Sequence, residues 1–336
     1  MKPKVFVTRR IPSPGPEILE EYCEVDVFLG EQPPKKEEIR IGVRGKDALL
    51  CLLTDKIDRD IMDAALSLRV ISSFSVGYDH IDVAEATRRG IYVTYTPGVL
   101  TEATADFAWT LLMTVARRIV EADRVVRTRN WKVGWGPTIL LGDDVYRKTL
   151  GIVGLGRIGT AVAQRAKGFN MRTIYFDVIR APLEKEKEFG VEYVPLEKLL
   201  KESDFISVHV PLMKETYHLF SEAQFRQMKR TAFLINTSRG AVVDEKALAK
   251  ALQERLIAGA ALDVFEKEPI DPDNPLLNMD NVVLAPHIAS ATKEARSKMS
   301  EVSAKNLIAV LKGEMPLFLV NKDVLNIRSL PQVKMI

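Results

Sequence analysis

Gly154-Leu155-Gly156-Arg157-Ile158-Gly159 is the stretch that decides the fold, because of the segments on either side of it. The apolar run before it, 148–153, predicts a buried parallel strand. The alanine-rich segment after it, 160–167, favours a helix, and a second strand-like run, 172–176, ends at Asp177. The three glycines allow a tight turn and close approach of the backbone to a pyrophosphate. We therefore expect a dinucleotide at the N-terminus of this helix, with Asp177 accepting hydrogen bonds from the adenosine ribose.

A glycine turn between a strand and a helix, with no ligand, is the alternative. The strand, the helix and the acid about 20 residues further on distinguish this stretch from an isolated match to the motif. The sequence therefore predicts a Rossmann-type dinucleotide unit.

The length and the charge of the chain limit its class. A chain of 336 residues is long for one hydrophobic core, which predicts two domains. The net charge is +3, and the 48 basic and 45 acidic residues are interspersed without a basic block. We therefore expect neither nucleic acid nor a membrane surface as a partner.

The N-terminal segment and the cysteines point to a cellular location. The first residues enter a predicted strand directly and lack the apolar region of a signal peptide. The longest apolar runs are shorter than a membrane span. Cys51 lies in the apolar run 48–53, and together with Cys23 it gives no disulfide framework, which favours reduced thiols. We expect a cytoplasmic protein.

Strand-like and helix-like segments alternate along the chain, which predicts parallel sheets with helices on both faces. The strands expected in the first hundred residues are 5–7, 49–53, 70–73 and 91–94. A second series comprises 149–153, 172–176, 204–209, 232–236, 259–263 and 282–284, and helices are expected at 245–255 and 293–312.

A long helix is expected to begin at a cap residue, Thr101. Its apolar stripe is Phe107, Leu111, Val115 and Ile119, and no Gly or Pro interrupts it before Gly134, so it could bridge two domains. The fold class expected is α/β with two doubly wound parallel-sheet domains. Residues 1–100 and 288–336 form a discontinuous substrate domain, and residues 101–287 form the dinucleotide-binding domain.

Polar and ionisable residues follow the predicted strands of the second series. The carboxyl ends of parallel strands meet at one edge of the sheet, where open α/β sheets bind their ligands. The segments at these ends are 154–159, Asp177, 209–211, 236–240, Asp263 and 286–287. Ordinary turn residues would not concentrate such groups at one edge, so we expect the functional site there.

Arg239, Glu268 and His287 are the candidate catalytic residues. Arginine offers a planar fork of donors that matches a carboxylate. A histidine moves a proton near neutral pH, and a carboxylate beside it favours the imidazolium, which can protonate a carbonyl oxygen as hydride reaches its carbon. The alternatives are a surface ion pair for Arg239, a solvated acid for Glu268 and a loop histidine for His287.

The other three histidines give weaker signals. His80 follows Asp79 in a turn, and His218 lies in a charged, helix-like segment. His209 ends a strand, so it could line a cofactor cleft or have a structural role. No spacing of His, Cys and Asp indicates a metal site, so we expect no metal.

As a set, these motifs resemble the D-isomer-specific 2-hydroxyacid dehydrogenase family over nearly the whole chain. The matching segments are 76–82, 151–159, 234–244, 261–269 and 285–290. Within the family the chain is most similar to glyoxylate/hydroxypyruvate reductases, as its segments 49–53 and 319–324 indicate. Ala289 stands where the family usually has glycine, and Ser238 stands where a small apolar residue is common.

The resemblance implies an NAD(P)H-dependent enzyme that reduces small 2-oxo acids, such as glyoxylate and hydroxypyruvate, in a cleft between two domains. Arg239 would anchor the substrate, His287 would be the acid and base, and Glu268 would be its partner. The substrate contacts expected are Leu53, Ser75, Val76, Gly77, Arg239 and His287. The cofactor contacts expected are Thr104, Gly154, Leu155, Gly156, Arg157, Ile158, Gly159, Asp177, His209, Val210, Pro211, Thr237, Ser238, Arg239, Asp263, His287 and Ala289.

Cofactor choice and assembly carry expectations of their own. Asp177 would meet the 2′-phosphate of NADP as like charge, so NAD is favoured, although Arg180 could swing across and pair with that phosphate. A homodimer built through the dinucleotide domain is expected from the resemblance, and Trp131 and Trp135 in a loop-like segment suit an interface.

Three alternative functions stay open. A D-3-phosphoglycerate dehydrogenase-like enzyme is the first, although little chain follows residue 312 for a regulatory domain. Another D-2-hydroxyacid dehydrogenase is the second. A non-enzymatic, NAD-sensing binding module is the third, and the intact set of Arg239, Glu268 and His287 counts against it.

Overall fold

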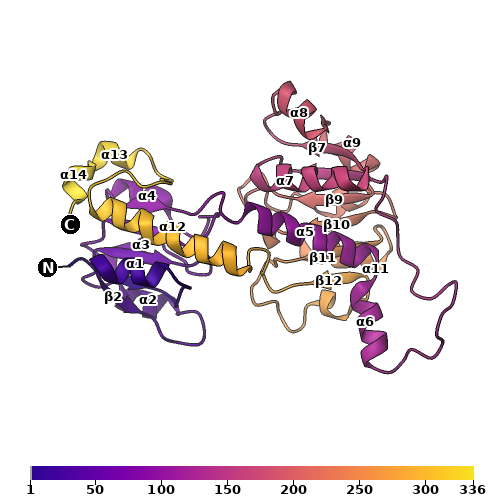
Figure 1. Ribbon diagram of the computed structural model, residues 1–336, viewed down its shortest axis with the longest axis horizontal. Helices are drawn as coiled ribbons and strands as arrows, with labels where there is room; N and C mark the ends of the chain where they lie inside the picture. The colour runs from indigo at the N-terminus through magenta and orange to yellow at the C-terminus, as the bar shows by residue number, and fades with distance from the viewer. Residues whose placement is uncertain (1) are drawn as a thin grey trace. The chain divides into compact units, whose positions relative to one another are not determined.

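The computed structural model describes residues 2–336 and divides the chain into two compact units. Unit 1 comprises Met1–Leu100 and Ala291–Ile336, and unit 2 comprises Thr101–Ser290, so that a continuous unit interrupts a discontinuous one (Figure 1). The sequence placed the second boundary three residues earlier, before residue 288. Residues 288 and 289 remain with unit 2 because their backbone N–H groups bind Asp263 of that unit.

Unit 1 contains a five-stranded sheet in the order β2-β1-β3-β4-β5, with all neighbours parallel. This is the flavodoxin-like order of doubly wound folds. Its strands are β1 (Lys4–Val7), β2 (Glu24–Val27), β3 (Ala48–Cys51), β4 (Val70–Ser73) and β5 (Tyr92–Thr94).

Helices cover both faces of this sheet. α1 and α12 pack together, and α12 contacts β3, β4 and β5. On the other face, Ile39, Ile61 and Ala86 of α2, α3 and α4 form a core with side chains of the strands, including Leu49 and Ile71. The helices of unit 1 are α1 (Gly15–Tyr22), α2 (Lys36–Gly42), α3 (Arg59–Ala64), α4 (Val83–Arg88), α12 (Lys293–Leu311), α13 (Val324–Ile327) and α14 (Leu330–Val333).

Unit 2 contains a seven-stranded parallel sheet in the order β12-β11-β10-β9-β6-β7-β8. The order reverses at β6, as the Rossmann fold requires, so the predicted fold class is confirmed. The strands are β6 (Thr149–Val153), β7 (Arg172–Phe176), β8 (Val191–Tyr193), β9 (Phe205–Val208), β10 (Phe233–Asn236), β11 (Gly259–Leu262) and β12 (Val282–Leu284).

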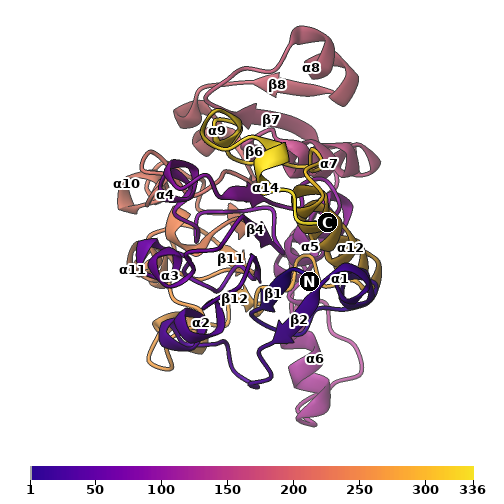
Figure 2. The ribbon, with the colours of Figure 1, turned by 90° about the vertical axis from the view of Figure 1, so that its left-hand side faces the viewer.

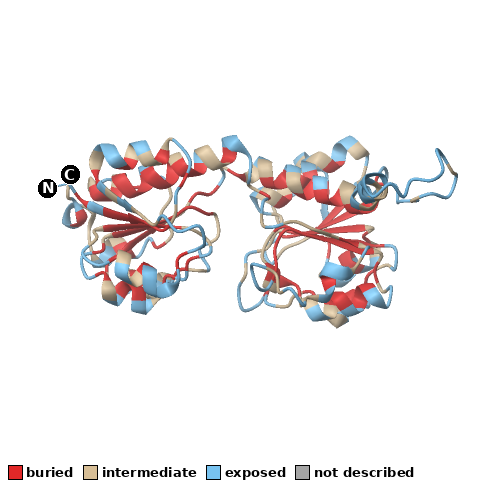
Figure 3. Ribbon diagram, turned by 90° about the horizontal axis from the view of Figure 1, so that it is seen from below, coloured by how far each residue is buried: buried red, intermediate tan, exposed pale blue. Residues whose placement is uncertain are grey.

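Successive residues of these strands face opposite helix layers. Ile206, Leu234 and Ala260 pack in the core that includes α9, α10 and α11, whereas Phe205 and Ala261 pack against α5 and α7. Helices cover both faces of the sheet, so the sequences of the central strands are continuous apolar runs. Figure 3 shows these strands in the colour of buried residues.

The helical elements of unit 2 are α5 (Thr101–Ala116), α6 (Ile119–Arg127), α7 (Arg157–Ala166), η1 (Lys167–Phe169), α8 (Leu183–Phe189), α9 (Leu196–Glu202), α10 (Glu222–Phe225), η2 (Gly240–Val242), α11 (Glu245–Gln253) and η3 (Pro275–Asn278). Among the described residues no helix is long and apolar enough to cross a membrane.

The prediction of one long helix from Thr101 is wrong, because two helices replace it. Thr101 is itself the first residue of α5 rather than its cap, and α5 ends at Ala116. Arg118 then adopts a left-handed conformation with φ of 52°, and α6 starts in a new direction. The Ala116 carbonyl accepts a hydrogen bond from the Asp143 N–H at 2.8 Å, so a returning segment completes the end of α5. Both helices belong to unit 2.

An arm formed by α6 and residues 128–144 extends beyond the rest of unit 2 in both Figures 1 and 2. None of the α6 side chains is buried. Trp131 and Trp135 lie in the loop part of the arm, as expected, and are 57% and 81% exposed. Figure 3 shows most of the arm in the colour of exposed residues.

Candidate active site

The glycine-rich turn connects β6 to α7 and leaves room for a ligand. Gly154 has a φ of +96°, and a Cβ there would approach the His209 carbonyl oxygen to 2.8 Å, so the position requires glycine. Gly156 precedes the first residue of α7, and no side chain caps this helix. A Cβ added at Gly156 would meet no atom within 4 Å. The uncapped N–H groups of α7 therefore face open space, and the turn fits the pyrophosphate of a dinucleotide.

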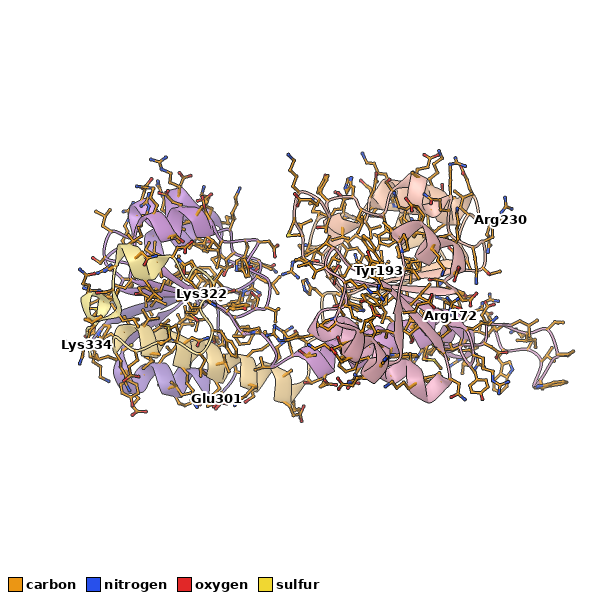
Figure 4. All side chains as sticks on the ribbon, turned by 90° about the horizontal axis from the view of Figure 1, so that it is seen from above. Arg172, Tyr193, Arg230, Glu301, Lys322 and Lys334 are labelled. Atoms are coloured by element: carbon orange, nitrogen blue, oxygen red, sulfur yellow. The ribbon has the colours of Figure 1, made fainter. Side chains whose placement is uncertain are left out.

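Asp177 follows β7 directly, and its carboxylate already binds the glycine-rich turn. Oδ2 accepts a hydrogen bond from the Leu155 N–H at 2.8 Å. Arg180 is engaged elsewhere, because its guanidinium donates to both carboxylate oxygens of Glu186 at 2.8 and 2.9 Å. The guanidinium carbon also lies 5.5 Å from the ring centre of Tyr193, which Figure 4 labels.

His209 follows β9 on the neighbouring strand, and Val210 and Pro211 continue its loop. Burial lowers the pKa of His209 to about 3, so the ring is neutral at ordinary pH. Its Nε2 lies 2.8 Å from the Ser207 hydroxyl oxygen. The loop after β9 thus carries a neutral histidine rather than a positive charge, and the backbone carbonyl of this histidine lies beside Gly154.

His287 and Glu268 form a close pair at the carboxyl end of the sheet. The distance from His287 Nδ1 to Glu268 Oε2 is 2.7 Å, and Glu268 Oε1 accepts a hydrogen bond from the Phe265 N–H at 3.1 Å. A carboxylate can only accept, so Nδ1 carries a proton and donates it to Glu268. The other ring nitrogen, Nε2, is then the atom that can exchange a proton with a ligand.

Asp263 holds the histidine loop in place. Its two carboxylate oxygens accept hydrogen bonds from the Ile288 and Ala289 N–H groups, both at 2.8 Å, and its carbonyl accepts from the His287 N–H. Burial raises the pKa of Asp263, although these two N–H donors favour the ionised form. The loop turns through His287 itself, whose φ of 55° lies in the left-handed region, which is unusual for a residue other than glycine.

The Arg239 loop is built by the buried Asn236 at the end of β10. The Asn236 amide donates to the Arg239 carbonyl at 2.9 Å, and its oxygen accepts from the N–H and the hydroxyl of Ser238. A Cβ added at Gly240 would lie 1.8 Å from the Phe265 carbonyl carbon, so only glycine allows the two loops to approach. The Thr237 hydroxyl is buried and has no partner among the described residues, which leaves it available to a ligand.

The predicted site residues therefore fall into two groups. The residues expected to contact the dinucleotide and to perform the chemistry lie in unit 2, where Thr104 is a buried residue of α5 and the others follow the strands. Leu53, Ser75, Val76 and Gly77 lie in unit 1, in the loops after β3 and β4. Among the residues described, no group of three His, Cys, Asp or Glu side chains could hold a metal ion.

Sequence reasoning missed the supports of this site. It treated Asn236 only as one polar residue after a strand, and it did not foresee that Asp263, expected as a cofactor contact, also binds two backbone N–H groups of the histidine loop. Both are polar side chains with no exposed surface at the end of an apolar strand. A buried polar group must have hydrogen-bond partners. A polar residue at the end of an apolar strand could therefore have indicated from the sequence that Asn236 and Asp263 support the neighbouring loops.

Fold and site together define a dinucleotide-binding oxidoreductase. The model of the D-isomer specific 2-hydroxyacid dehydrogenase NAD binding domain matches residues 109–289. A glyoxylate reductase of Korarchaeum cryptofilum is 62% identical over 98% of both chains. Two solved structures are also similar. The TT0316 protein of Thermus thermophilus has a TM-score of 0.89 at 46% identity and covers 94% of this chain and 99% of its own. An NADPH-dependent glyoxylate/hydroxypyruvate reductase of Sinorhizobium meliloti, in complex with NADP and malonate, has a TM-score of 0.84 at 34% identity, with 96% and 98% covered.

The chain belongs to the D-isomer specific 2-hydroxyacid dehydrogenase family, as its motifs indicated. The family consists of nicotinamide-dependent oxidoreductases, so the expectation of an enzyme is confirmed.

Proposed function

We propose that this protein reduces glyoxylate, and more generally small 2-oxo acids such as hydroxypyruvate, to the 2-hydroxy acids, with NADH as the preferred cofactor. The His287–Glu268 pair carries this proposal, because it holds a histidine with one ring nitrogen bound and the other able to act. The choice of substrate rests on the glyoxylate reductase that is 62% identical.

The bound nicotinamide would supply the hydride for the keto carbon. The Nε2–H of the His287 imidazolium protonates the carbonyl oxygen as charge develops on it, and Glu268 stabilises the imidazolium through Nδ1. Asp263 and the left-handed turn at His287 keep the ring in place, so little reorganisation is required during the reaction.

Arg239 binds the substrate carboxylate and the carbonyl oxygen with its fork of donors. The N–H groups of Val76 and Gly77 bind the carboxylate, and Leu53 contacts the rest of the small substrate. The uncapped end of α7 would hold the dinucleotide, together with the Thr237 hydroxyl, Ser238 and Thr104.

Initial rates test the proposal directly. NADH and NADPH should each be measured against glyoxylate, hydroxypyruvate, pyruvate and phosphohydroxypyruvate. We expect glyoxylate and hydroxypyruvate to have the highest kcat/KM with NADH. A chain that turns over only phosphohydroxypyruvate, or none of the four, would contradict the proposal.

Two variants test the roles of the residues. His287→Ala should lower kcat by about 10² to 10⁴, the usual contribution of a positioned acid. Arg239→Ala should in addition raise KM for the oxo acid, because it removes a charged hydrogen-bond donor of the substrate. Near-normal kcat/KM in either variant would remove that residue from the mechanism.

We also propose that two copies form a homodimer through the arm of unit 2. A cavity of about 580 Å³ lies between α6 and the amino ends of β10, β11 and β12 and is lined by apolar and charged side chains, among them Val120, Leu141 and Val283. A second copy could fill this cavity while covering the exposed arm. A cytoplasmic location stays a prediction.

A further inference from the structure

A chain of hydrogen bonds runs beneath the loop that follows β4 in unit 1. His80 Nε2 lies 3.2 Å from Ser73 Oγ, Ser73 Oγ lies 2.6 Å from Ser75 Oγ, and the Ser75 hydroxyl donates to the Gly77 carbonyl at 2.6 Å. Ser73 and Ser75 are 0% and 3% exposed. From the sequence, no role was predicted for His80, and Ser75 was predicted only as a direct substrate contact.

The chemistry of the groups fixes the direction of this chain. A carbonyl oxygen only accepts, so the single hydroxyl proton of Ser75 goes to Gly77. The proton between the two serines must then come from Ser73. Ser73 has no second proton, so His80 Nε2 must carry one and donate it. The chain therefore runs from His80 through Ser73 and Ser75 to the Gly77 carbonyl.

The loop held by this series of hydrogen bonds presents backbone N–H donors. In the part of the chain that the structure describes, no group accepts a hydrogen bond from the N–H groups of Val76, Gly77 or Tyr78. Consecutive N–H groups of this kind bind anions when the backbone orients them together. The ends of the loop are also fixed, because the Ser75 carbonyl accepts from the Thr96 N–H and the His80 carbonyl accepts from the Ile57 N–H, both at 2.9 Å.

We propose that His80, Ser73 and Ser75 are positioning residues that orient the Val76–Gly77 backbone for the carboxylate of the oxo acid. They touch neither substrate nor cofactor and act only through the Gly77 carbonyl. This inference rests on the proposed function, because it takes a 2-oxo acid as the ligand of the loop. It reassigns Ser75 from a substrate contact to a support of the loop, since its hydroxyl is buried and engaged with Ser73 and Gly77.

Binding of oxamate to the NADH-loaded enzyme tests the inference without turnover. Ser73→Ala and Ser75→Ala should each weaken oxamate binding by about threefold to tenfold, the effect of one hydrogen bond. KM for glyoxylate should rise by a similar factor, whereas kcat and KM for NADH should change by less than about twofold. His80→Phe should behave like the serine variants, and His80→Gln should retain most of the affinity, because its amide offers a donor in place of Nε2.

A double variant and a matched control separate positioning from general damage. Adding His80→Phe to Ser73→Ala should cause little further loss, since both break the same chain. Ser72→Ala is the control, because the Ser72 hydroxyl is equally buried on the same strand but donates to the Ser303 carbonyl at 2.8 Å. It should lower the melting temperature without changing the oxamate affinity.

The outcomes distinguish the two proposals. Normal oxamate affinity in both serine variants, or an equal loss of NADH affinity, would overturn the positioning role and leave the proposed function intact. If a serine variant does not fold, the oxamate affinities of His80→Phe and His80→Gln test the positioning role instead. Equal oxamate affinities in these two variants would also overturn that role. A wild-type enzyme that binds no oxamate and reduces no glyoxylate would contradict the proposed function and this inference together.

Discussion

Asp177 is the residue on which the choice between NADH and NADPH depends. Its carboxylate accepts a hydrogen bond from the Leu155 N–H. Arg180, the residue expected to pair with a 2′-phosphate, is bound to Glu186. We therefore expect the wild type to prefer NADH. Asp177→Ser should lower the ratio of kcat/KM for NADH to that for NADPH by about tenfold, because it removes the repulsion of the 2′-phosphate and a ribose acceptor.

The control for this prediction is Glu184→Ser, which removes one exposed negative charge from the nearby helix α8. It should leave the ratio unchanged. A wild type that prefers NADPH, or an Asp177→Ser variant with the wild-type ratio, would show that another residue sets the choice.

His209 links the stability of the chain to pH. Its pKa is about 3 in the folded chain against 6.5 for the ordinary group, so between these values the unfolded chain binds up to one more proton. The lowered pKa means that the stability linked to His209 is present above about pH 6.5 and is lost as pH falls toward 3. His209→Gln should remove this dependence, so its melting temperature should fall less between pH 7 and pH 5 than that of the wild type. Parallel curves for the two proteins would contradict this linkage.

Arg239 follows β10 and Glu268 follows β11, so these two loops must lie close together if both residues belong to one site. Gly240 permits this close approach. Gly240→Ala would place a methyl group 1.8 Å from the Phe265 carbonyl carbon, and backbone atoms cannot move aside as a side-chain end could. We expect a loss of about 1–3 kcal/mol in the free energy of unfolding, typical of overpacking. We also expect kcat to fall at least about tenfold, because displacement of the loop moves Glu268 from His287.

Gly168→Ala is the matched control for Gly240→Ala. Gly168 lies in the short helix η1, and an added Cβ there would meet no atom within 4 Å. This control should be neutral or slightly stabilising, since alanine restricts the unfolded chain more than glycine does. Full activity and stability in Gly240→Ala would disprove the need for this close approach.

Elements buried on both sides could be predicted from the sequence, and elements set by distant contacts could not. β6, β7 and β10 are apolar runs, so their positions and the site residues that follow them were recognisable. β2 alternates polar and apolar residues at the edge of its sheet, and β8, also an edge strand, has the charged Glu192 at its centre, so neither is a continuous apolar run and neither was expected. The end of α5 depends on Asp143, which lies 27 positions after Ala116, and no local residue type signals that contact.

The same distinction applies to the candidate site. The residue types of Arg239, Glu268 and His287 indicated their chemistry, and their positions after strands indicated a common edge. The supports formed by Asp263 and by the His80–Ser73–Ser75 chain depend on hydrogen bonds to backbone groups of neighbouring loops. Such bonds are fixed by the tertiary placement of the loops, which a single sequence does not specify.

At the scale of the whole molecule, the arm of unit 2 exposes several large apolar side chains, and these carry the prediction about assembly. Trp131, Val133, Trp135 and Leu141 of the arm are each more than half exposed. Water contact of so many large apolar side chains on one projecting segment is unfavourable, and aromatic residues are typical of protein interfaces. We expect light scattering at micromolar concentration to give twice the mass of one chain for the wild type.

Replacing both tryptophans of the arm, Trp131→Ser with Trp135→Ser, should shift this mass toward that of a single chain, because it removes the largest apolar contacts available to a partner. Leu66→Ser is the control, since Leu66 is 90% exposed but belongs to unit 1, whereas the arm belongs to unit 2. The control should retain the mass of two chains. A monomeric wild type would end the idea of a dimer, and a dimeric double variant would move the interface away from these two residues. If both proteins stay dimeric with equal dissociation constants, the arm has another function.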